Sequence, residues 1–438
     1  MTVHAPSTAL LTDHYELTMV EAALRSGAAS RRCVFEVFAR RLPEGRRYGV
    51  VAGTGRLVEA VERFRFTEAE IEFLRTTGVV DEPTLEFLAG YRFTGDIWGY
   101  AEGECYFPGS PVLVVESDFA EAVVLETLVL SILNHDSAVA SAASRMTSAA
   151  GDRPCIEMGS RRTHEEAAVA SARAAYIAGF ATTSNLEAGR RYGVPTAGTA
   201  AHAFTLLHDD EREAFSAQIA SLGKGTTLLV DTYDVTRAVE LAVELAGPEL
   251  GAVRLDSGDL LAQAREVREQ LDRLGATGTK IVVTSDLDEH AIAALAAGPV
   301  DRYGVGTSLV TGSGAPTAGM VYKLVARTDD SGELVGVAKK SKDKHSVAGR
   351  KYALRRRNAK GVAEAEVIGI GEAPADDGND RALLVPLVKG GEVVDRDALA
   401  LDVARARHDA SRAELPPAAH RLQRGEPVIP TVFEDAQP

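Results

Sequence analysis

Cysteine is scarce in this chain. Its 438 residues include only Cys33, Cys105 and Cys155, which stand far apart. This spacing offers neither a disulfide framework nor a zinc knuckle. We therefore expect a protein of the reducing cytoplasm.

Basic residues are also under-represented, since 48 Lys and Arg face 63 Asp and Glu, for a net charge of −15. Binding to nucleic acid or to an anionic membrane needs a basic surface, so both are disfavoured, although a local basic pocket for an anion is not. No uninterrupted apolar run approaches the length of a membrane span. The N-terminus lacks the basic start and apolar core of a secretion signal.

The bulk composition is that of an ordinary globular protein, with 45% hydrophobic and 25% charged residues. A chain of this length is long enough for two or three domains. We expect an N-terminal α/β sandwich domain over residues 1–130 and a domain carrying the active site over residues 131–330. A C-terminal segment over residues 331–438 would complete the sandwich.

One rhythm repeats between about residues 155 and 311: a short apolar run, a polar cluster, then an amphipathic helix. The seven polar clusters fall at 157–162, 180–185, 196–202, 229–234, 254–259, 283–288 and 303–308. Alternation of strand and helix predicts a parallel sheet, either closed into a barrel or open and doubly wound. In both folds the polar clusters gather at the carboxyl ends of the strands, where active sites lie.

The flanking regions follow other patterns. The first 150 residues predict a helix from Thr12 to Gly27, strands at 33–38 and 95–115, and a buried helix at 121–133. Beyond residue 330 we expect a basic loop at 339–344, strands between 362 and 388 and a helix at 398–415. The tail from Pro416 is expected to be extended.

The segment Arg254-Leu-Asp-Ser-Gly-Asp259 is the most informative of the seven clusters. Residues two apart in a strand share a face, so Arg254 and Asp256 point the same way. Asp259 stands where a helix N-cap belongs. A polar site and a capped turn beside a surface ion pair account for the segment about equally well.

Three further features are candidates for a site, each with a plainer alternative. Gly304-Val-Gly-Thr307 is either a phosphate-binding loop or a tight turn, and the turn is favoured before context is considered. Of Arg161 and Arg162, we expect one to bind an anion and the other to have a structural role. His202 is a general base, a nucleophile or a structural residue. Metal binding by histidines is disfavoured because His208 is six residues away.

Asp231 follows another strand-like run, in Leu228-Leu-Val-Asp. The run is weakly similar to the acidic motif of nucleotide-salvage phosphoribosyltransferases, but the second acid of that motif is missing. A strand cap is the simpler interpretation of this carboxylate.

Taken together, the segments resemble nicotinate phosphoribosyltransferases, in the same order and at similar spacing over residues 10–325. The matching segments are Leu10-Leu-Thr-Asp-His-Tyr-Glu-Leu-Thr-Met19, Gly159-Ser-Arg-Arg162, Thr183-Ser-Asn185, Gly198-Thr-Ala-Ala-His202, Val230-Asp-Thr-Tyr-Asp234, Arg254 to Asp259, Gly304 to Thr307 and Val321-Tyr-Lys-Leu324.

The resemblance implies a dimeric enzyme of NAD biosynthesis. It would make nicotinate mononucleotide and pyrophosphate from nicotinate and phosphoribosyl pyrophosphate, with coupled ATP hydrolysis. The implied fold is α/β: an irregular α/β barrel of the type II phosphoribosyltransferase kind, packed on a smaller α/β sandwich domain. The implied cofactors are Mg²⁺ and ATP as a cosubstrate.

The resemblance also implies roles for individual residues. His202 matches the histidine that ATP phosphorylates, and Tyr15 matches a ring that stacks on the pyridine from across the dimer interface. Substrate contacts are implied for Arg254, Thr199, Arg161, Ser184, Ser285, Gly304, Gly306 and Thr307. Ser184 stands where nicotinamide-specific relatives carry Asp, and a neutral side chain there favours a carboxylate substrate.

Met158 departs from the pattern, because many relatives carry Phe at this position; a thioether can still pack on an aromatic face. The Mg²⁺ of the leaving pyrophosphate would be reached by Asp256 or Asp259, directly or through water. The alternatives are a nicotinamide or quinolinate phosphoribosyltransferase, or a non-catalytic ligand-binding relative.

Overall fold

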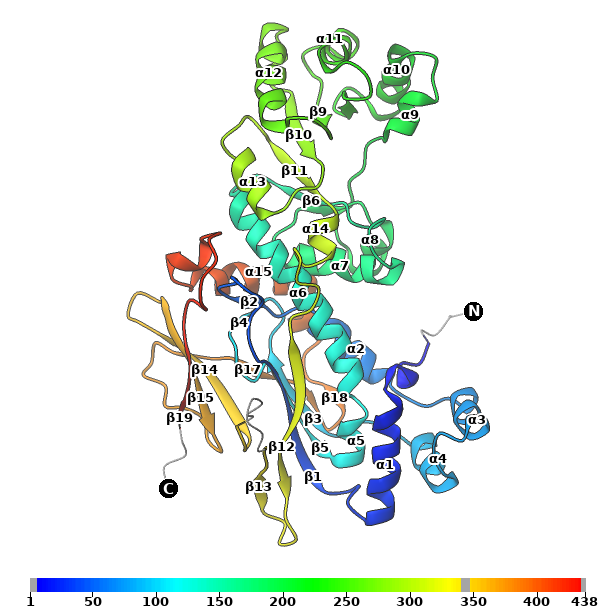
Figure 1. Cartoon of the computed structure of the whole chain (residues 1–438), viewed down its shortest axis with the longest axis vertical. Coiled ribbons are helices and arrows are strands. Elements are labelled where there is room, and N and C mark those ends of the chain that lie inside the picture. The colour runs from blue at the N-terminus through cyan, green and yellow to red at the C-terminus, as the bar shows by residue number, and fades with distance from the viewer. Residues whose placement is uncertain (1–5, 340–346, 435–438) are drawn as a thin grey trace. The chain divides into compact units, whose positions relative to one another are not determined.

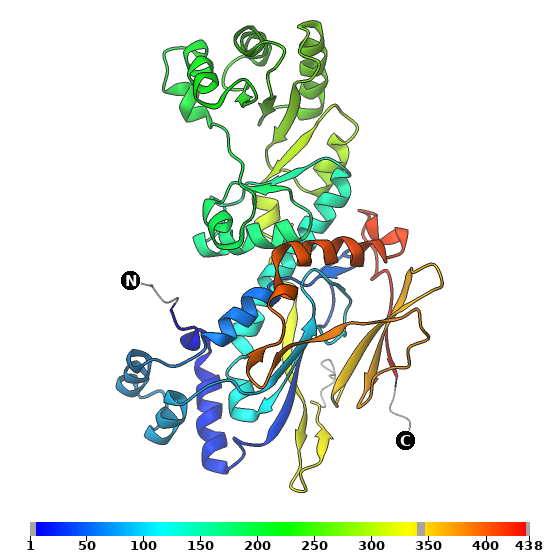
Figure 2. The same cartoon turned by 180° about the vertical axis from the view of Figure 1, so that it is seen from behind.

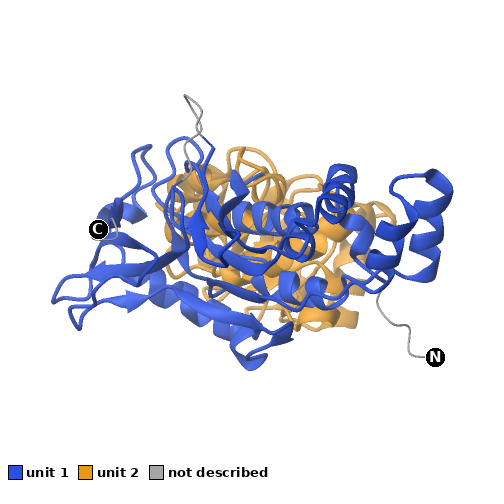
Figure 3. Ribbon diagram, turned by 90° about the horizontal axis from the view of Figure 1, so that it is seen from below, with its two compact units in different colours: residues 1–138, 317–438 blue, residues 139–316 orange. Residues whose placement is uncertain are grey.

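The computed structural model describes residues 6–339 and 347–434. The chain divides into two compact units, coloured separately in Figure 3. Unit 1 comprises residues 1–138 and 317–438, and unit 2 comprises residues 139–316. The C-terminal segment thus belongs to the same unit as the N-terminal segment, and unit 2 is an insertion between them.

The main sheet of unit 1 is antiparallel throughout the described residues (Figure 1). In spatial order its strands are β13 (Leu334–Gly336), β12 (Met320–Thr328), β1 (Arg32–Ala39), β5 (Leu113–Asp118), β3 (Asp96–Tyr100), β17 (Leu384–Lys389) and β18 (Glu392–Val393). Strand β1 lies in the interior of this sheet, between β12 and β5, and is almost wholly buried.

Helix α1 (His14–Ser26) confirms the expected helix after Thr12. It ends because Gly27 adopts φ 76°, a left-handed conformation that glycine tolerates best. Its apolar face, including Leu17 and Val20, is part of the core of unit 1. The other helices of this unit are α2 (Thr54–Glu62), α3 (Glu68–Thr77), α4 (Glu82–Ala89), α5 (Phe119–Val123), the first half of α6 (Glu126–Ala150) and α15 (Leu401–Ala413).

A smaller sheet completes unit 1 (Figure 2). Its strands are β16 (Arg381–Ala382), β14 (Lys351–Arg357), β15 (Ala363–Ile370) and β19 (Thr431–Glu434), and β2 (Gly49–Val50) pairs separately with β4 (Cys105–Tyr106). The expectation of an extended tail from Pro416 is wrong over its first turn. Pro417–His420 form a 3₁₀ helix, because proline suits a first helical position and Ala419 is buried. Of the expected basic loop at 339–344, residues 340–344 lie outside the described residues.

Unit 2 contains the predicted parallel sheet, with strands in the order β7 (Thr182–Thr183), β6 (Cys155–Glu157), β11 (Arg302–Val305), β10 (Lys280–Thr284), β9 (Ala252–Leu255) and β8 (Thr227–Leu229). Thr196 adds only an isolated parallel bridge to Thr183, where the sequence rhythm predicts a seventh strand. Its neighbours Pro195, Ala197 and Gly198 supply no apolar run that could be buried on both faces. Within the described residues the ladder does not close, so the sheet is an irregular, open barrel.

Besides the second half of α6, the helices of unit 2 follow its strands along the chain, with three of them between β7 and β8. They are α7 (Glu165–Ile177), α8 (Leu186–Tyr192), α9 (His202–Leu206), α10 (Glu211–Leu222), α11 (Val235–Ala246), α12 (Leu260–Arg273), α13 (Glu289–Leu295) and α14 (Thr307–Val310). Side chains of Asn185, Asp234, Asp259 and Asp288 cap four of them. The predicted helices at 165–179, 235–247 and 260–275 are therefore confirmed.

The stretch Phe119–Ala150, which includes α6, is long and apolar enough to cross a membrane by length and composition alone. However, 67% of its most apolar window is buried inside the protein. Such burial is typical of a core helix that its neighbours cover.

Candidate active site

Arg254 lies at the carboxyl end of β9, and its side chain is only 12% exposed. Nε donates to Thr284 Oγ1 at 3.1 Å, and Nη1 donates to the carbonyl of Ala200 at 3.1 Å and to Thr199 Oγ1 at 3.4 Å. The guanidinium is thus held between β10 and the loop before α9. Two residues that the sequence proposed for one site, Arg254 and Thr199, are in contact.

The strand exit after Arg254 is both a polar site and a capped turn. Asp256 accepts a hydrogen bond from the Thr284 hydroxyl and lies 3.7 Å from Arg254 Nη2. Asp259 Oδ1 accepts from the backbone N–H of Ala262 at 3.1 Å and so caps α12. Asp256 thus belongs to the polar cluster with Arg254, and Asp259 is the helix cap.

His202 stands at the start of α9, beside the end of β8. Its Nδ1 is 3.1 Å from Thr232 Oγ1, and its Nε2 is 3.8 Å from Asp231 Oδ1. The side chain of Asp231 is 2% exposed and accepts from the backbone N–H of Asp256 at 2.9 Å and from Ser257 Oγ at 2.8 Å. Its Oδ1 is buried without a hydrogen-bond partner among the described residues. A buried carboxylate oxygen facing an imidazole suits a group that becomes charged or modified.

The strand-cap interpretation of Asp231 is confirmed for one of its oxygens. Oδ2 accepts hydrogen bonds at the β9 exit, while Oδ1 lies 3.8 Å from His202 Nε2. The place of Asp231 in the same strand-end rhythm as His202 and Arg254 was the available signal for this second contact.

A buried carboxylate also organises the ends of β6 and β7. Glu157 is fully buried and accepts from the backbone N–H of Gly159 and from the hydroxyl of Thr183, and burial raises its pKa. The backbone N–H of Ser184 donates to the Glu157 carbonyl at 2.8 Å. Ser184 itself is exposed, as expected of a side chain that meets substrate.

The neighbouring turn carries the two arginines. The backbone N–H of Arg162 donates to the Gly159 carbonyl at 2.8 Å, and both Arg161 and Arg162 are exposed. Asn185 Nδ2 donates to Ser160 Oγ at 3.0 Å, which ties this turn to the start of α8. The guanidiniums are thus available to an anion at the sheet edge.

The segment from Gly304 to Thr307 runs from the end of β11 to the first residue of α14 and requires glycine for close packing. A Cβ on Gly304 would lie 2.4 Å from Thr284 Cγ2 and 2.8 Å from Met158 Sδ. Gly306 precedes α14, which Thr307 begins, and its Cβ would approach the Met158 carbonyl to 3.3 Å. Met158 therefore lies against the loop that the sequence assigned to a phosphate.

Ser285 follows β10 with φ 153°, a backbone conformation that residues with a side chain rarely adopt. Its carbonyl accepts from the backbone N–H of Leu287 at 2.8 Å, which closes a tight turn. Strained backbone of this kind is concentrated at functional sites. Ser285 lies next to Thr284, which contacts both Arg254 and Asp256.

Tyr15 is the one proposed site residue in unit 1. It lies on α1 with 46% of its surface exposed. Burial of part of the ring and the nearby Glu126 raise the pKa of Tyr15 to about 12. The phenol stays protonated at neutral pH, and its ring is accessible for stacking.

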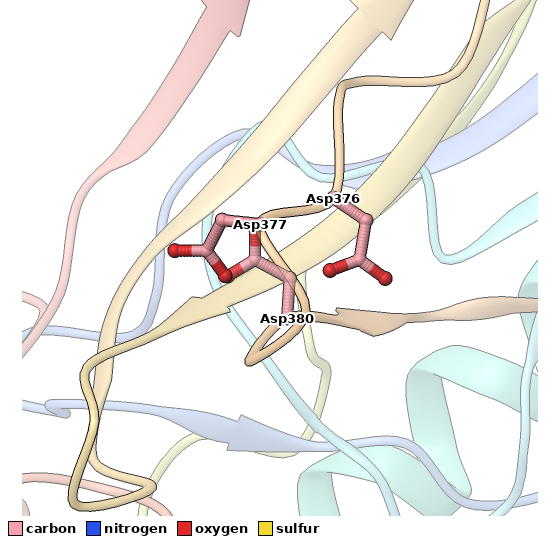
Figure 4. A group of neighbouring side chains, drawn as sticks. All are labelled: Asp376, Asp377 and Asp380. Carbon is pink, nitrogen blue, oxygen red and sulfur yellow. The ribbon is translucent and has the colours of Figure 1, made fainter.

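Among the described residues, only Asp376, Asp377 and Asp380 form a group of three side chains that could hold a metal (Figure 4). They lie in unit 1, and their oxygens accept hydrogen bonds from the backbone of Gly378, Asn379 and Arg357. In unit 2 the carboxylate of Asp256 is 30% exposed. It suits a cation that keeps most of its ligands as water and phosphate, as Mg²⁺ does.

Comparison with known proteins agrees with this geometry. Residues 10–134 match the family model of the nicotinate phosphoribosyltransferase (NAPRTase) N-terminal domain. Nicotinate phosphoribosyltransferase pncB1 of Mycobacterium tuberculosis is 61% identical over 431 residues, which cover 96% of this chain and 94% of the relative. The human nicotinate phosphoribosyltransferase is 31% identical, with 83% of this chain and 80% of the relative covered.

A solved structure supports the same conclusion. The crystal structure of human nicotinic acid phosphoribosyltransferase superposes with a TM-score of 0.82 at 27% identity, covering 96% of this chain and 97% of that chain. The fold is therefore that of the barrel-containing, type II phosphoribosyltransferases. Within this class, the chain belongs to the nicotinate phosphoribosyltransferase family and is an enzyme of that type.

Proposed function

We propose that the enzyme makes nicotinate mononucleotide and pyrophosphate from nicotinate and phosphoribosyl pyrophosphate, in cytoplasmic NAD biosynthesis. The relatives' names supply the substrate class. The observation that carries the proposal is the cluster at the ends of β8, β9 and β10, where Arg254 and His202 are each held by hydrogen bonds. A chain of net charge −15 needs such a local cation to bind an anionic substrate.

In the proposed reaction the lone pair of the pyridine nitrogen forms the bond to ribose C1. The C1–O bond breaks, and its electron pair leaves with pyrophosphate. Arg254 and the neutral Ser184 would receive the pyridine carboxylate, while Gly304, Gly306 and Thr307 would hold the 5′-phosphate. Arg161 would neutralise phosphate charge from the turn after β6.

Mg²⁺ would balance the charge of the leaving pyrophosphate. Asp256 fits this role because one of its oxygens accepts from Thr284 while the carboxylate stays partly exposed. Asp259 fits less well, since one of its oxygens caps α12.

We propose further that ATP phosphorylates His202. An imidazole nitrogen would attack the γ-phosphorus, ADP would leave, and water would later release inorganic phosphate. The Asp231 carboxylate beside Nε2 favours the tautomer with its proton on that atom, which leaves the Nδ1 lone pair for attack. The added negative charge would then strengthen Mg²⁺-dependent binding of phosphoribosyl pyrophosphate.

The proposal includes a homodimer, in which Tyr15 of one protomer stacks on the pyridine bound by the other. Its support is the exposed ring of Tyr15 and its exposed neighbours Leu10 and Leu11. A nicotinamide-specific or quinolinate-specific enzyme is disfavoured by the family match, and nicotinamide also by the neutral Ser184. A non-catalytic relative has no specific observation in its favour.

The decisive experiment compares His202→Ala with His208→Ala. His208 lies six residues away and contacts the carbonyl of Phe204 at 2.9 Å, so it is a matched imidazole outside the cluster. We expect His202→Ala to abolish the acid-labile phosphoenzyme formed with radiolabelled ATP and to uncouple ATP hydrolysis from mononucleotide formation. His208→Ala should retain both. A phosphoenzyme that survives in His202→Ala would refute the assignment.

The substrate is tested separately by offering nicotinate, nicotinamide and quinolinate to the wild-type enzyme under identical conditions. Pyrophosphate release that depends on nicotinate is expected. Release that depends on one of the other two pyridines, or on none, would overturn the proposed function.

A further inference from the structure

We infer that Thr284 is a positioning residue: its single hydroxyl holds Arg254 and Asp256 in place and keeps the cation and the anion apart. The inference rests on the proposed function, since it concerns how the substrate-binding arginine and the proposed magnesium ligand are presented. Thr284 belongs to none of the motifs on which the family resemblance was based.

The hydroxyl of Thr284 makes two hydrogen bonds of opposite sense. It accepts from Arg254 Nε at 3.1 Å and donates to Asp256 Oδ1. A hydroxyl can do both because it has one proton and two lone pairs. Arg254 Nη2 and Asp256 Oδ1 remain 3.7 Å apart, beyond the 2.7–2.9 Å of a direct charge-assisted hydrogen bond.

The orientation of Thr284 is fixed by its surroundings. It is the last residue of β10, only 3% exposed, and it lies opposite Gly304 in the parallel ladder with β11. A Cβ on Gly304 would come within 2.4 Å of Thr284 Cγ2, so the methyl group fills the space that glycine leaves. A β-branched side chain has few χ1 rotamers, and with its methyl group placed there the hydroxyl is directed to the β9 side.

Removing the hydroxyl would leave Arg254 Nε and Asp256 Oδ1 without this partner. The least costly remedy is a direct ion pair between the two, because an unpaired, partly buried charge is expensive. Arg254 would then be turned from the pyridine carboxylate, and the Asp256 carboxylate would be drawn towards Arg254 and away from its proposed position at Mg²⁺. We therefore expect the KM for nicotinate to rise and kcat to fall.

The test uses two matched variants. Thr284→Val keeps the shape and removes the hydroxyl, whereas Thr284→Ser keeps the hydroxyl and removes the methyl group. We expect kcat/KM for nicotinate to fall on the order of 10- to 100-fold in Thr284→Val, as for loss of hydrogen bonds to charged groups. Thr284→Ser should stay within about 3-fold of wild type.

A purely structural role would lower activity only through stability. Thermal unfolding of both variants separates the two cases, because the inference expects Thr284→Val to stay folded at the assay temperature while its kcat/KM falls. A double-mutant cycle adds a second criterion: in an Arg254→Ala background, Thr284→Val should cost less than in the wild-type background, since part of its effect passes through Arg254. Full additivity of the two losses would overturn the inference.

A crystal structure of Thr284→Val tests the inference independently of turnover. We expect the distance between Arg254 and Asp256 to shorten from 3.7 Å to hydrogen-bond length. An unchanged distance, or a Thr284→Ser enzyme as impaired as Thr284→Val, would refute the positioning role. If wild-type enzyme forms no mononucleotide, the proposed function fails, and this structural result still decides the role of Thr284.

Discussion

Arginine and carboxylate meet in both units, and the two arrangements differ in how deeply the charges are buried and how closely they pair. In unit 1, Arg355 is completely buried and donates to Glu104 at 2.9 Å, to the carbonyl of Cys105 at 2.7 Å and to Glu366. In unit 2, Arg254 and Asp256 are partly exposed, lie 3.7 Å apart and are connected by a threonine. Similar groups thus form a buried network in one unit and stay partly exposed to solvent in the other.

The unit 1 network is closed by second partners. Arg381 donates to the other oxygen of Glu104 at 2.8 Å, and Ser110 donates to Glu366. Although burial opposes it, Arg355 and Arg381 hold the pKa of Glu104 below its ordinary value. Removing one partner from such a network leaves a buried charge uncompensated, whereas removing a charge that faces solvent does not.

The largest expected difference comes from making the same substitution in both units. Arg355→Met should cost about 3–5 kcal/mol of the free energy of unfolding, because Glu104 and Glu366 lose their shared cation. Arg254→Met should change stability by about 1 kcal/mol or less and lower kcat/KM by at least 100-fold, roughly 2.7 kcal/mol of transition-state stabilisation. Urea denaturation and steady-state kinetics on both variants measure the contrast.

Equal losses of stability in the two variants would remove the distinction between the units. So would near-normal kcat/KM in Arg254→Met. Arg265→Met, at an exposed position on α12, controls for the loss of a positive charge as such.

A smaller effect should appear in the pH dependence of stability, through His408 in unit 1. Burial, with the nearby Arg412, lowers the pKa of His408 to about 3. The folded state therefore keeps this imidazole neutral while the unfolded state gains a proton below about pH 6.5. Stability should fall as the pH drops from 6.5 towards 3, by at most about 1.4 kcal/mol per pH unit from this residue.

His408→Leu should remove that slope while leaving the dependence of nicotinate turnover on substrate concentration unchanged. Chemical denaturation at pH 7.5, 6 and 5 measures the slope. His290→Leu, at an exposed site, is the control and should leave it intact. A wild-type slope in His408→Leu would show that other groups cause the acid sensitivity.

The smallest expected effect concerns Asp259 in unit 2. Two substitutions at this position distinguish a helix cap from a Mg²⁺ ligand. Asp259→Ser preserves a good N-cap and should change stability by a few tenths of a kcal/mol, whereas Asp259→Ala should cost about 1 kcal/mol. Because one oxygen of Asp259 serves α12, kcat/KM of Asp259→Ser should stay within about 3-fold of wild type. A tenfold loss at limiting Mg²⁺ would instead make Asp259 a ligand.

The sequence predicted the elements of unit 2 well because their signals are local. Apolar runs, polar N-caps such as Asp234 and Asp288, and helix-ending glycines all act within a few residues. The prediction of a strand at Thr196 was wrong. The neighbours of Thr196 lack the apolar run that a buried strand needs, and Thr196 makes only an isolated bridge.

The residues of the candidate site stand out in the sequence, but their contacts do not. Arg254, His202 and the Gly304 segment are candidates because of their strand-end positions. The contacts of Asp231, Thr284 and Glu157 join residues about 25 to 30 positions apart, and no local pattern reveals such pairs. The buried network of Arg355 was missed for this reason, because its partners are up to 251 positions away.

The insertion of unit 2 within unit 1 affects how the chain matures on the ribosome. Strand β1 leaves the ribosome early, but its neighbour β12 pairs Met320 with Ala39 and is made only after the whole barrel. At about 5–20 residues per second, the β12 side of β1 has no native partner for roughly 15–55 s. During that interval it is an apolar strand edge open to aggregation, so newly made chains should depend on chaperones more than the finished enzyme's stability would suggest.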